Sequence, residues 1–479
     1  GRAGAPRGPG GPGVIDAVVA GTGLTALQAA LDLAEVGLRV AVVEHAEPGE
    51  VAGGASGEDA AAEPSPEPDH EGAVATLIER IAEGLPGAAG GGRPELRARA
   101  VPPVAPLLRG RSGAWCRQPE PEVWGIPAVP LAAETIAALG SAGALRAYLD
   151  RFTPLLTVGK TRSLGTLVRK RLGATALGTL VGPQLRERYG VPAEEVEVAI
   201  AAPGLNEALT RTGSLSAAAL AYSERHAGRE TSIVPEAGWG ELRSALIERL
   251  GLYGVEFPAS PIADATRRDD GGWELGFDDG SALRARAAVV DLSSGTAGTG
   301  FDAFLEQVLP RRFRMHAAIG IEAPEGLSVG EVALRGAGDW SLRLEPRESP
   351  REGEGGSPDG GEGGTAPAGA WRARLSSPRL EAGAAELGAD PRPLLYELLA
   401  QAGVRARPEA TWSIAVRAGA HCTAEERERE SAALRVLSEA EPELLAIGRA
   451  LHGDDLSAAL DSAHRGAVEL RRWLLGIAA

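Results

Sequence analysis

The stretch VIDAVVAGTGLTALQAALDLAEVGLRVAVVE, residues Val14–Glu44, decides the fold of this 479-residue chain. Residues 14–20 form a short apolar run rich in Val and Ile, residues 24–36 carry apolar side chains at helical spacing, and residues 39–44 return to a strand pattern. The triplet Gly21-Thr22-Gly23 stands between the first strand and the helix. This order predicts a strand, a helix and a second strand in one βαβ unit.

Each special residue of this unit has a physical role. Gly21 permits the tight turn off the strand, and Gly23, which lacks a Cβ, lets a pyrophosphate approach the N–H groups at the positive end of the helix. Ala26 is small enough for the helix to pack closely on the strand, and Gly37 ends the helix. Glu44 closes the second strand, where a carboxylate can accept hydrogen bonds from both hydroxyls of an adenosine ribose. The spacing predicts dinucleotide binding; a chance helical hairpin is the alternative.

The composition limits the class of function. The formal net charge of −16 argues against sequence-independent nucleic-acid binding, which needs basic side chains to neutralise phosphates. No run of about 18 apolar residues occurs, so we expect no transmembrane helix. Cys116 and Cys422 cannot build a disulfide framework and have no partners at zinc spacing. The histidines have no Ser, Cys or carboxylate at a recognisable catalytic spacing, so we expect neither a catalytic residue of that kind nor a metal site.

The length of the chain predicts two domains rather than one core. We predict an α/β fold: a Rossmann-like FAD/NAD(P)-binding domain, a mixed-sheet second domain and a helical insertion. The Rossmann-like domain is expected at residues 14–92, 231–300 and 440–479, the mixed-sheet domain at residues 93–130 and 301–439, and the helical insertion at residues 131–225. A composition rich in Ala, Gly, Glu and Pro predicts loops or disorder at residues 1–13, 45–70 and 345–369.

Two features bear on where the protein acts. The chain starts at Gly1 without Met, which is expected either at a cloning boundary or after removal of an organellar targeting peptide. We therefore expect a soluble or peripheral protein of a plastid or mitochondrion, or of the bacterial cytoplasm. The basic cluster Arg169-Lys170-Arg171 is expected on an exposed helical turn, as a solvated face or as a contact with a membrane surface or a partner.

Two further segments carry a resemblance to a known family. They are SLGTLVRKRLGATALGTLVGPQLRERYGVPAEEVEV at residues 163–198 and IVPEAGWGELRSALIERL at residues 233–250. With the opening unit, they resemble the FAD-dependent amine-oxidase superfamily and, within it, the protoporphyrinogen oxidase family. The resemblance implies a flavin reaction of tetrapyrrole biosynthesis, which removes hydrogens from a porphyrinogen, and a helical insertion that helps relatives to associate with membranes. It assigns the ADP half of FAD to Gly21, Gly23, Leu24, Thr25, Ala26 and Glu44, with the backbone of Ile262 facing the adenine.

Two motifs of that family are altered in this chain. The family places Arg or Lys after a Gly-Gly pair that follows the second strand, and here Ala55 follows Gly53-Gly54. Near the C-terminus, Arg449 replaces the Asn or Asp of the family, Asp455 replaces a turn glycine, and Ala458 stands where the family has an acid.

The acidic residues at the start of the last helix have an electrostatic consequence. Asp454 and Asp455 are good helix caps, and they place negative charge in the electropositive pocket that would otherwise receive the cofactor. We therefore expect FAD binding to be weak or lost. Two hypotheses follow: a non-catalytic subunit of a larger assembly that has kept the flavoprotein scaffold, or an active FAD-dependent oxidoreductase with a divergent flavin site.

Overall fold

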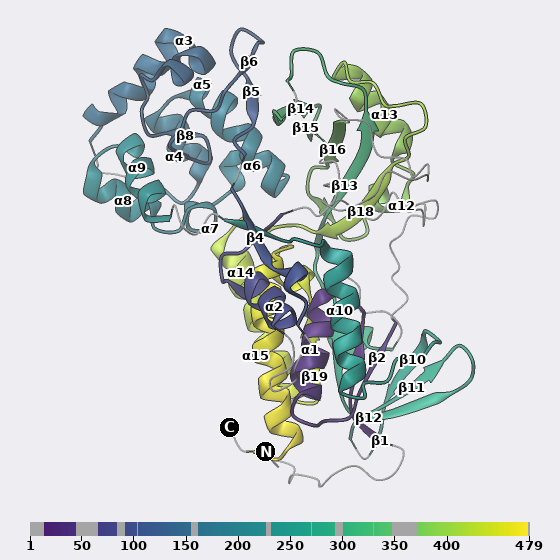
Figure 1. Ribbon diagram of the computed structural model, residues 1–479. Helices are drawn as coiled ribbons and strands as arrows, with labels where there is room; N and C mark the ends of the chain where they lie inside the picture. The colour runs from purple at the N-terminus through teal and green to yellow at the C-terminus, as the bar shows by residue number, and fades with distance from the viewer. Residues whose placement is uncertain are drawn as a thin grey trace.

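The computed structural model describes residues 14–44, 66–83, 92–102, 104–154, 161–226, 231–269, 271–292, 300–328, 330–346 and 371–477. Figure 1 shows three groups of elements: a sheet with helices around it in the lower half, a second sheet at the upper right and a helical region at the upper left. Purple, teal and yellow segments meet in the lower group, so its core is built from three distant parts of the chain.

The lower sheet has parallel strands at its centre. β1 pairs with β2 on one side and with β12 on the other, and β19 pairs with β12, all in parallel. β10 and β11 form an antiparallel meander with the first half of β12. The strands are β1 Val14–Ala20, β2 Val40–Val43, β10 Ile262–Arg267, β11 Trp273–Phe277, β12 Ala282–Asp291 and β19 Leu444–Ile447. The predicted βαβ unit is thus confirmed, and later parts of the chain complete its sheet.

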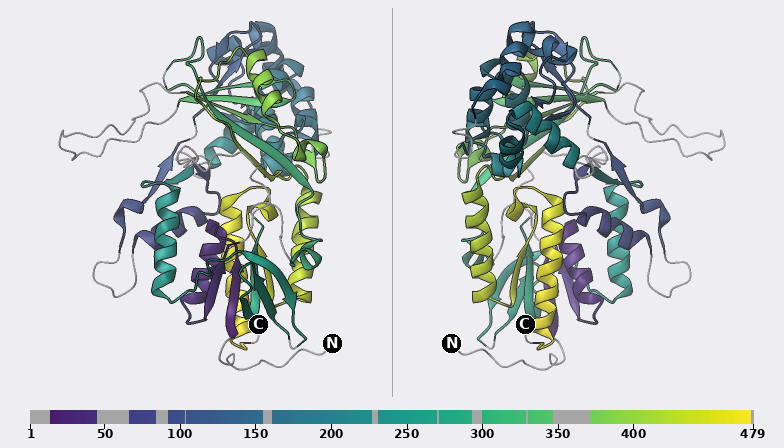
Figure 2. Two further views of the ribbon diagram at one scale, coloured as in Figure 1. Left: turned by 90° about the vertical axis from the view of Figure 1, so that its right-hand side faces the viewer. Right: turned by 90° about the vertical axis from the view of Figure 1, so that its left-hand side faces the viewer.

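Helices cover both faces of this sheet because its parallel strands are apolar on both sides. Ala17 and Val19 of β1 pack towards α1, α2, α10 and α15, whereas Val18 and Ala20 pack towards α14 and the meander. Figure 2 shows the sheet between α15 on one side and α14 on the other. These helices are α1 Leu24–Ala34, α2 Ala73–Ala82, α10 Trp239–Leu252, α14 Ala424–Ala440 and α15 Leu456–Leu474.

The second sheet is mixed, as predicted. Its order is β17-β13-β16-β15-β14-β5-β6, with β18 beside β13. β14 and β5 are parallel, and the other pairs are antiparallel. One face packs on α13 through Ile319, Leu395 and Leu399. The elements are β5 Leu107–Arg109, β6 Trp115–Cys116, β13 Arg312–Ile321, β14 Ala333–Ala337, β15 Trp340–Pro346, β16 Trp371–Ser376, β17 Leu380–Glu381, β18 Ser413–Ala418 and α13 Arg392–Gln401.

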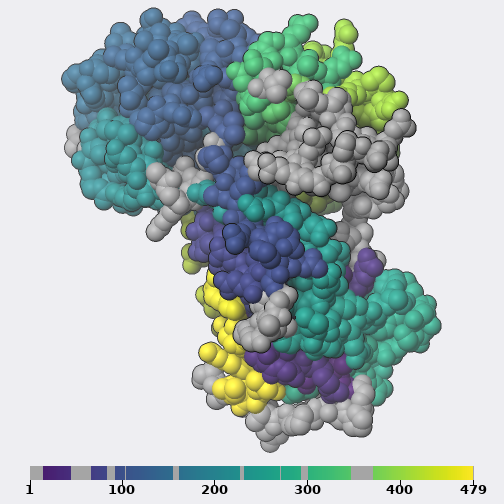
Figure 3. All heavy atoms as spheres, in the orientation of Figure 1, coloured from purple at the N-terminus to yellow at the C-terminus, as the bar shows by residue number. Residues whose placement is uncertain are grey.

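The third group is helical and lies beside the second sheet, as Figure 3 shows in blue and green. A short π-helix, Leu177–Val181, joins α5 to α6. The helices are α3 Ala133–Tyr148, α4 Leu164–Arg171, α5 Ala174–Ala176, α6 Gly182–Tyr189, α7 Val198–Ala201, α8 Leu205–Thr212 and α9 Leu215–His226.

The prediction that the basic cluster of α4 is wholly exposed is wrong for Arg171. This side chain is only 1% exposed, and its Nε lies 3.0 Å from Oδ1 of the equally buried Asp150. Arg169 and Lys170 are exposed. Arg171 faces inward because the third residue of the cluster falls on the core side of a helix whose other inward positions are apolar.

A small sheet of β3, β9 and β4 stands apart from the other two. Its strands are Glu67–Pro68, Ser232–Pro235 and Ala98–Val101. β3 lies within the predicted loop 45–70, and β15 extends two residues into the predicted loop 345–369, so both predictions are wrong at these ends. The remainder of the two loops and residues 1–13 lie outside the described residues, and the domain boundaries remain a prediction.

A few further elements complete the described chain. Residues 254–257 make a single parallel bridge to the lower sheet, between Ala41 and Glu256. Among the described residues, no helix combines the length and apolar character needed to cross a bilayer. The remaining short strands and α-helices are β7 Glu122–Val123, β8 Ile126–Pro127, α11 Asp302–Leu305 and α12 Ala385–Gly388.

Candidate nucleotide site

The turn between β1 and α1 has the geometry expected of an anion-binding turn. Gly21 has a φ of +128°, which L side chains rarely adopt, and its N–H donates to Val43 O at 3.0 Å. Gly23 is the N-cap of α1 and makes no side-chain cap, and the first turn of α1 holds no acidic residue. The N–H groups of Leu24 and Thr25 therefore stand at the positive end of a helix that no carboxylate of its own first turn neutralises.

The other predicted nucleotide residues lie around this turn. Ala26 is completely buried in the core beneath α1. Glu44 directly follows β2, and its side chain is exposed. Because β1 and β2 are parallel, Gly21 and Glu44 lie at the same edge of the sheet. Ile262 begins β10, and its side chain is buried in the same cluster as Val43. That the Ile262 backbone faces an adenine remains a prediction.

A carboxylate that sequence reasoning missed lies beside the turn. Asp291, the last residue of β12, is 5% exposed, and Thr25 Oγ1 donates to its Oδ2 at 3.0 Å. A Cβ placed on Gly21 would come within 2.6 Å of the Asp291 Cβ, so these two residues are in direct contact. An anion bound at the start of α1 would lie close to this carboxylate. The signal in the sequence was an aspartate closing the otherwise apolar run AAVVDL at residues 287–292.

The segment before α15 holds a cluster of charged side chains. Arg449 donates from Nη1 and Nη2 to the two carboxylate oxygens of Glu67 at 2.9 and 3.1 Å, and from Nε to Asp454 Oδ1 at 3.0 Å. Arg417 lies 3.6 Å from the other Asp454 oxygen. Burial alone would disfavour the charged guanidinium, but the two carboxylates outweigh this effect and raise the pKa of Arg449. We call Glu67, Arg449 and Asp454 the arginine cluster. In it, one guanidinium pairs with two carboxylates.

The N-terminus of α15 is occupied by side chains of the protein. Asp455 is the N-cap and accepts a hydrogen bond from Ala458 N at 3.0 Å. Ser457 Oγ donates to Asp69 Oδ1 at 2.6 Å, and Asp69 also accepts from the first turn of α2, including Val74 N at 3.0 Å. This confirms that Asp455 caps the last helix, and it shows that α15 and α2 share one network of carboxylates at their N-termini.

The two halves of a FAD site fit this structure unequally. The uncapped start of α1, Gly21 and Glu44 suit an ADP group, although Asp291 opposes its phosphates. At the other end, the N-terminus of α15 already has a carboxylate cap, and Arg449 is committed to Glu67 and Asp454. The charged side chains at this helix end therefore pair with groups of the protein. The altered Ala55 lies outside the described residues.

The described residues contain no group of three or more His, Cys, Asp or Glu side chains that could hold a metal ion. Burial lowers the pKa of His316 to about 3, and nearby Arg314 and Arg417 act in the same direction. Burial likewise lowers the pKa of His452 to about 4. Both side chains are half-buried and neutral near pH 7.

Comparison with solved structures identifies the fold of the chain. No protein-family model matches the chain, and no curated protein sequence matches it. A structure from Exiguobacterium sp. 255-15 assigned as a protoporphyrinogen oxidase is 17% identical, with a TM-score of 0.61 over 95% of this chain and 99% of that chain. Cyclohexylamine oxidase from Brevibacterium oxydans IH-35A is 13% identical, with a TM-score of 0.52 over 96% of this chain and 100% of that chain. An oxidoreductase from Methanosarcina mazei is 13% identical, with a TM-score of 0.50 over 94% and 100%. The chain therefore has the fold of the FAD-dependent amine oxidase superfamily.

Proposed function

We propose that this protein keeps the flavoprotein scaffold without the flavin chemistry and serves as a non-catalytic binding or structural subunit of a larger assembly. The observation that supports this most directly is the arginine cluster with the Asp455 cap at the start of α15. In the family that the sequence resembles, this position approaches the flavin ring and ribityl chain. In this chain, Asp455 caps the N-terminus of α15, and Arg449 pairs with Glu67 and Asp454.

Energetics favour this arrangement over a bound flavin. Admitting the cofactor would require Arg449 to release Glu67 or Asp454, and losing a partly buried, charge-assisted hydrogen bond costs about 1.5–3 kcal/mol. The carboxylate of Asp291 adds repulsion at the opposite end of the site. Both effects act against binding, so the intact β1–α1 turn is expected to serve mainly as a tight structural turn or as a weak site for an ADP-like group.

Binding of a partner is suggested by surface features. The predicted loops 45–70 and 345–369 are acidic in composition, and the chain carries a net charge of −16. In the helical region, Leu145, Leu149 and Phe152 are 52%, 45% and 72% exposed. These residues follow one another at helical spacing, so they form an apolar strip suited to a protein partner or to peripheral contact with a membrane.

The alternative is an active FAD-dependent oxidoreductase of the protoporphyrinogen oxidase or amine oxidase type, acting on a porphyrinogen or a similar hydrophobic substrate. The uncapped N-terminus of α1 and the exposed Glu44 favour it, because both suit the ADP half of FAD. In this alternative, the arginine cluster would have to open when the flavin binds.

Flavin content separates the two functions. The protein is purified with excess FAD, freed of unbound cofactor by gel filtration, and its visible flavin absorbance is measured per chain. We expect far less than one flavin per chain, and one tightly held flavin per chain would refute the proposal.

A double variant tests whether the arginine cluster weakens FAD binding. Glu67→Gln with Arg449→Asn removes the Arg449–Glu67 ion pair, leaves the Asp454 charge in place, and is expected to raise FAD retention. The control, Asp461→Asn with Arg465→Asn, removes an exposed pair of α15 and should leave retention unchanged.

The proposed assembly is tested by the size of the native protein. In extracts of its source cells, the protein should migrate well above its 49.2 kDa, and migration as a monomer would contradict the proposed assembly.

A further inference from the structure

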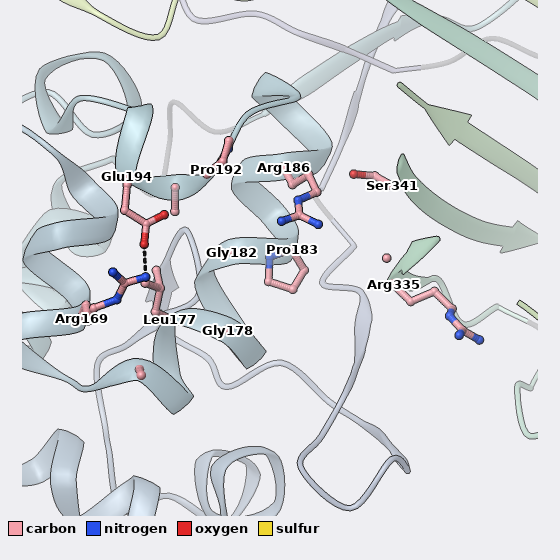
Figure 4. A pocket seen from close by; sticks show the side chains of 13 residues that line it. Arg169, Leu177, Gly178, Gly182, Pro183, Arg186, Pro192, Glu194, Arg335 and Ser341 are labelled. Carbon is pink, nitrogen blue, oxygen red and sulfur yellow. Dashed lines mark hydrogen bonds and ion pairs between the residues drawn. The ribbon is translucent and has the colours of Figure 1, made fainter. Parts of the chain in front are cut away.

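A cavity of about 360 Å³ lies between the helical region and the second sheet. This volume is within the range of small-molecule sites. Figure 4 shows its helical wall on one side and the strands β14 and β15 on the other. In Figure 1, α6 and β14 lie in the upper half of the molecule and α1 in the lower half, so this cavity is separate from the β1–α1 turn.

The cavity exists because its walls lack side-chain volume. A Cβ on Gly178 would meet no atom within 4 Å, and a Cβ on Gly336 would meet its nearest atom at 3.9 Å. Gly178 belongs to the π-helix Leu177–Val181, and such helices often occur at functional sites. Space for a larger side chain is therefore present on both walls and is left open.

Two polar side chains, those of Arg186 and Ser341, line this space. Ser341 of β15 is 4% exposed, and its Oγ has no hydrogen-bond partner among the described residues. Figure 4 shows this hydroxyl directed towards Arg186 of α6. Arg186 forms no ion pair within the described part of the chain. A buried hydroxyl without a partner is unfavourable, so a bound group that pairs with it gains free energy.

The other charged residues of the wall are committed elsewhere. Arg169 forms an ion pair with Glu194 (Figure 4). Arg335 is turned away from the cavity, and its Nη1 donates to Ala402 O at 3.0 Å. Among the described lining residues, this leaves the guanidinium of Arg186 to bind an anionic ligand.

The sheet fixes the helix turn that carries Arg186. Arg314 of β13 donates from Nη1 to Glu187 O at 2.7 Å and to Arg188 O at 3.1 Å. Arg343 of β15 donates to the Glu187 carboxylate at 3.0 Å. These contacts hold the last turn of α6 against the sheet, so Arg186 and Ser341 are positioned before any ligand binds.

We propose that this cavity binds a small organic monocarboxylate with an apolar body. A guanidinium presents two parallel N–H groups to a carboxylate, and the Ser341 hydroxyl can donate a further hydrogen bond to it. The apolar body would rest against the remaining wall, to which Leu177, Pro183 and Pro192 contribute. One available cation favours one carboxylate over a dianion, and the limited volume favours a small acid.

Binding of benzoate to the full-length protein tests this proposal, with benzamide as a neutral ligand of the same shape and inorganic phosphate as an anion without an apolar body. Titrations are followed by isothermal calorimetry and by saturation-transfer NMR. We expect benzoate to bind more tightly than benzamide or phosphate. Arg186→Gln should weaken benzoate binding on the order of tenfold or more, which is the value of a charge-assisted hydrogen bond.

Two further variants supply the controls. Arg188→Gln removes a neighbouring exposed arginine of α6 that does not line the cavity, and it should bind benzoate as the parent does. Gly336→Val places a strand-compatible side chain in the cavity and should abolish binding. Equal binding of benzoate and benzamide, tighter binding of phosphate, or equal losses in the Arg186 and Arg188 variants would overturn the proposal. Flavin content is measured separately, so this test is independent of the proposed function.

Discussion

Replacing Asp291 by Asn isolates the electrostatic effect of this carboxylate on nucleotide binding. The amide has nearly the same shape and can still accept the hydrogen bond that Thr25 Oγ1 donates at 3.0 Å. The contact with Gly21 also remains, since the Cβ is unchanged. The substitution therefore removes a negative charge beside the β1–α1 turn with little change in packing.

The expected magnitude follows from the position of Thr25 in the first turn of α1. Asp291 accepts from Thr25 Oγ1 at 3.0 Å, so a phosphate bound to the N–H groups of that turn is taken to lie about two hydrogen-bond lengths, roughly 6 Å, from the carboxylate. At this separation and an effective dielectric of about 20, two unit charges repel by about 3 kcal/mol. Removing that repulsion corresponds to a gain in ADP affinity on the order of a hundredfold.

The assay is a calorimetric titration of ADP into the parent protein and into Asp291→Asn at fixed ionic strength. Asp278→Asn serves as the control, because this exposed aspartate lies in the turn between β11 and β12. We expect tighter ADP binding in the first variant and no change in the second. The same affinity in the parent and in Asp291→Asn, or an equal gain in both variants, would refute the reasoning.

Three further predictions concern stability and reactivity. Arg449→Met should lower the free energy of unfolding in urea by about 1.5–3 kcal/mol, because two carboxylates lose their half-buried partner, whereas Arg465→Met at an exposed pair should cost about 0.5 kcal/mol or less. Burial lowers the pKa of His316 from 6.5 to about 3, so the unfolded chain takes up a proton that the folded protein does not. Between pH 6.5 and about pH 3, protonation of His316 should thus lower the free energy of unfolding by about 1.4 kcal/mol per pH unit, and urea titrations should show a shallower fall for His316→Gln. Burial raises the pKa of Cys422 to about 11, so mass spectrometry should find iodoacetamide on Cys116 well before Cys422 at pH 8.

The local sequence pattern predicts much of the lower sheet. β1, α1 and β2 follow from apolar spacing and two glycines. Tight turns in the sequence also predict a meander with strands at residues 262–267 and 273–277, and β10 and β11 have these bounds. The inward orientation of Arg171 was not predicted, because its charge suggests a surface position while its partner Asp150 lies on another element.

The βαβ unit, the meander and the altered residues near the C-terminus can be recognised from the sequence alone, because each is encoded within a few tens of neighbouring residues. The contacts of these residues follow only from the three-dimensional packing of the chain. Arg449 pairs with Glu67, 382 positions away, and Asp291 reaches Thr25 across 266 positions. The placement of Arg186 and Ser341 along one cavity likewise depends on the packing of a helix against a sheet. Such contacts depend on side-chain direction and on the docking of distant elements, and no local spacing specifies either.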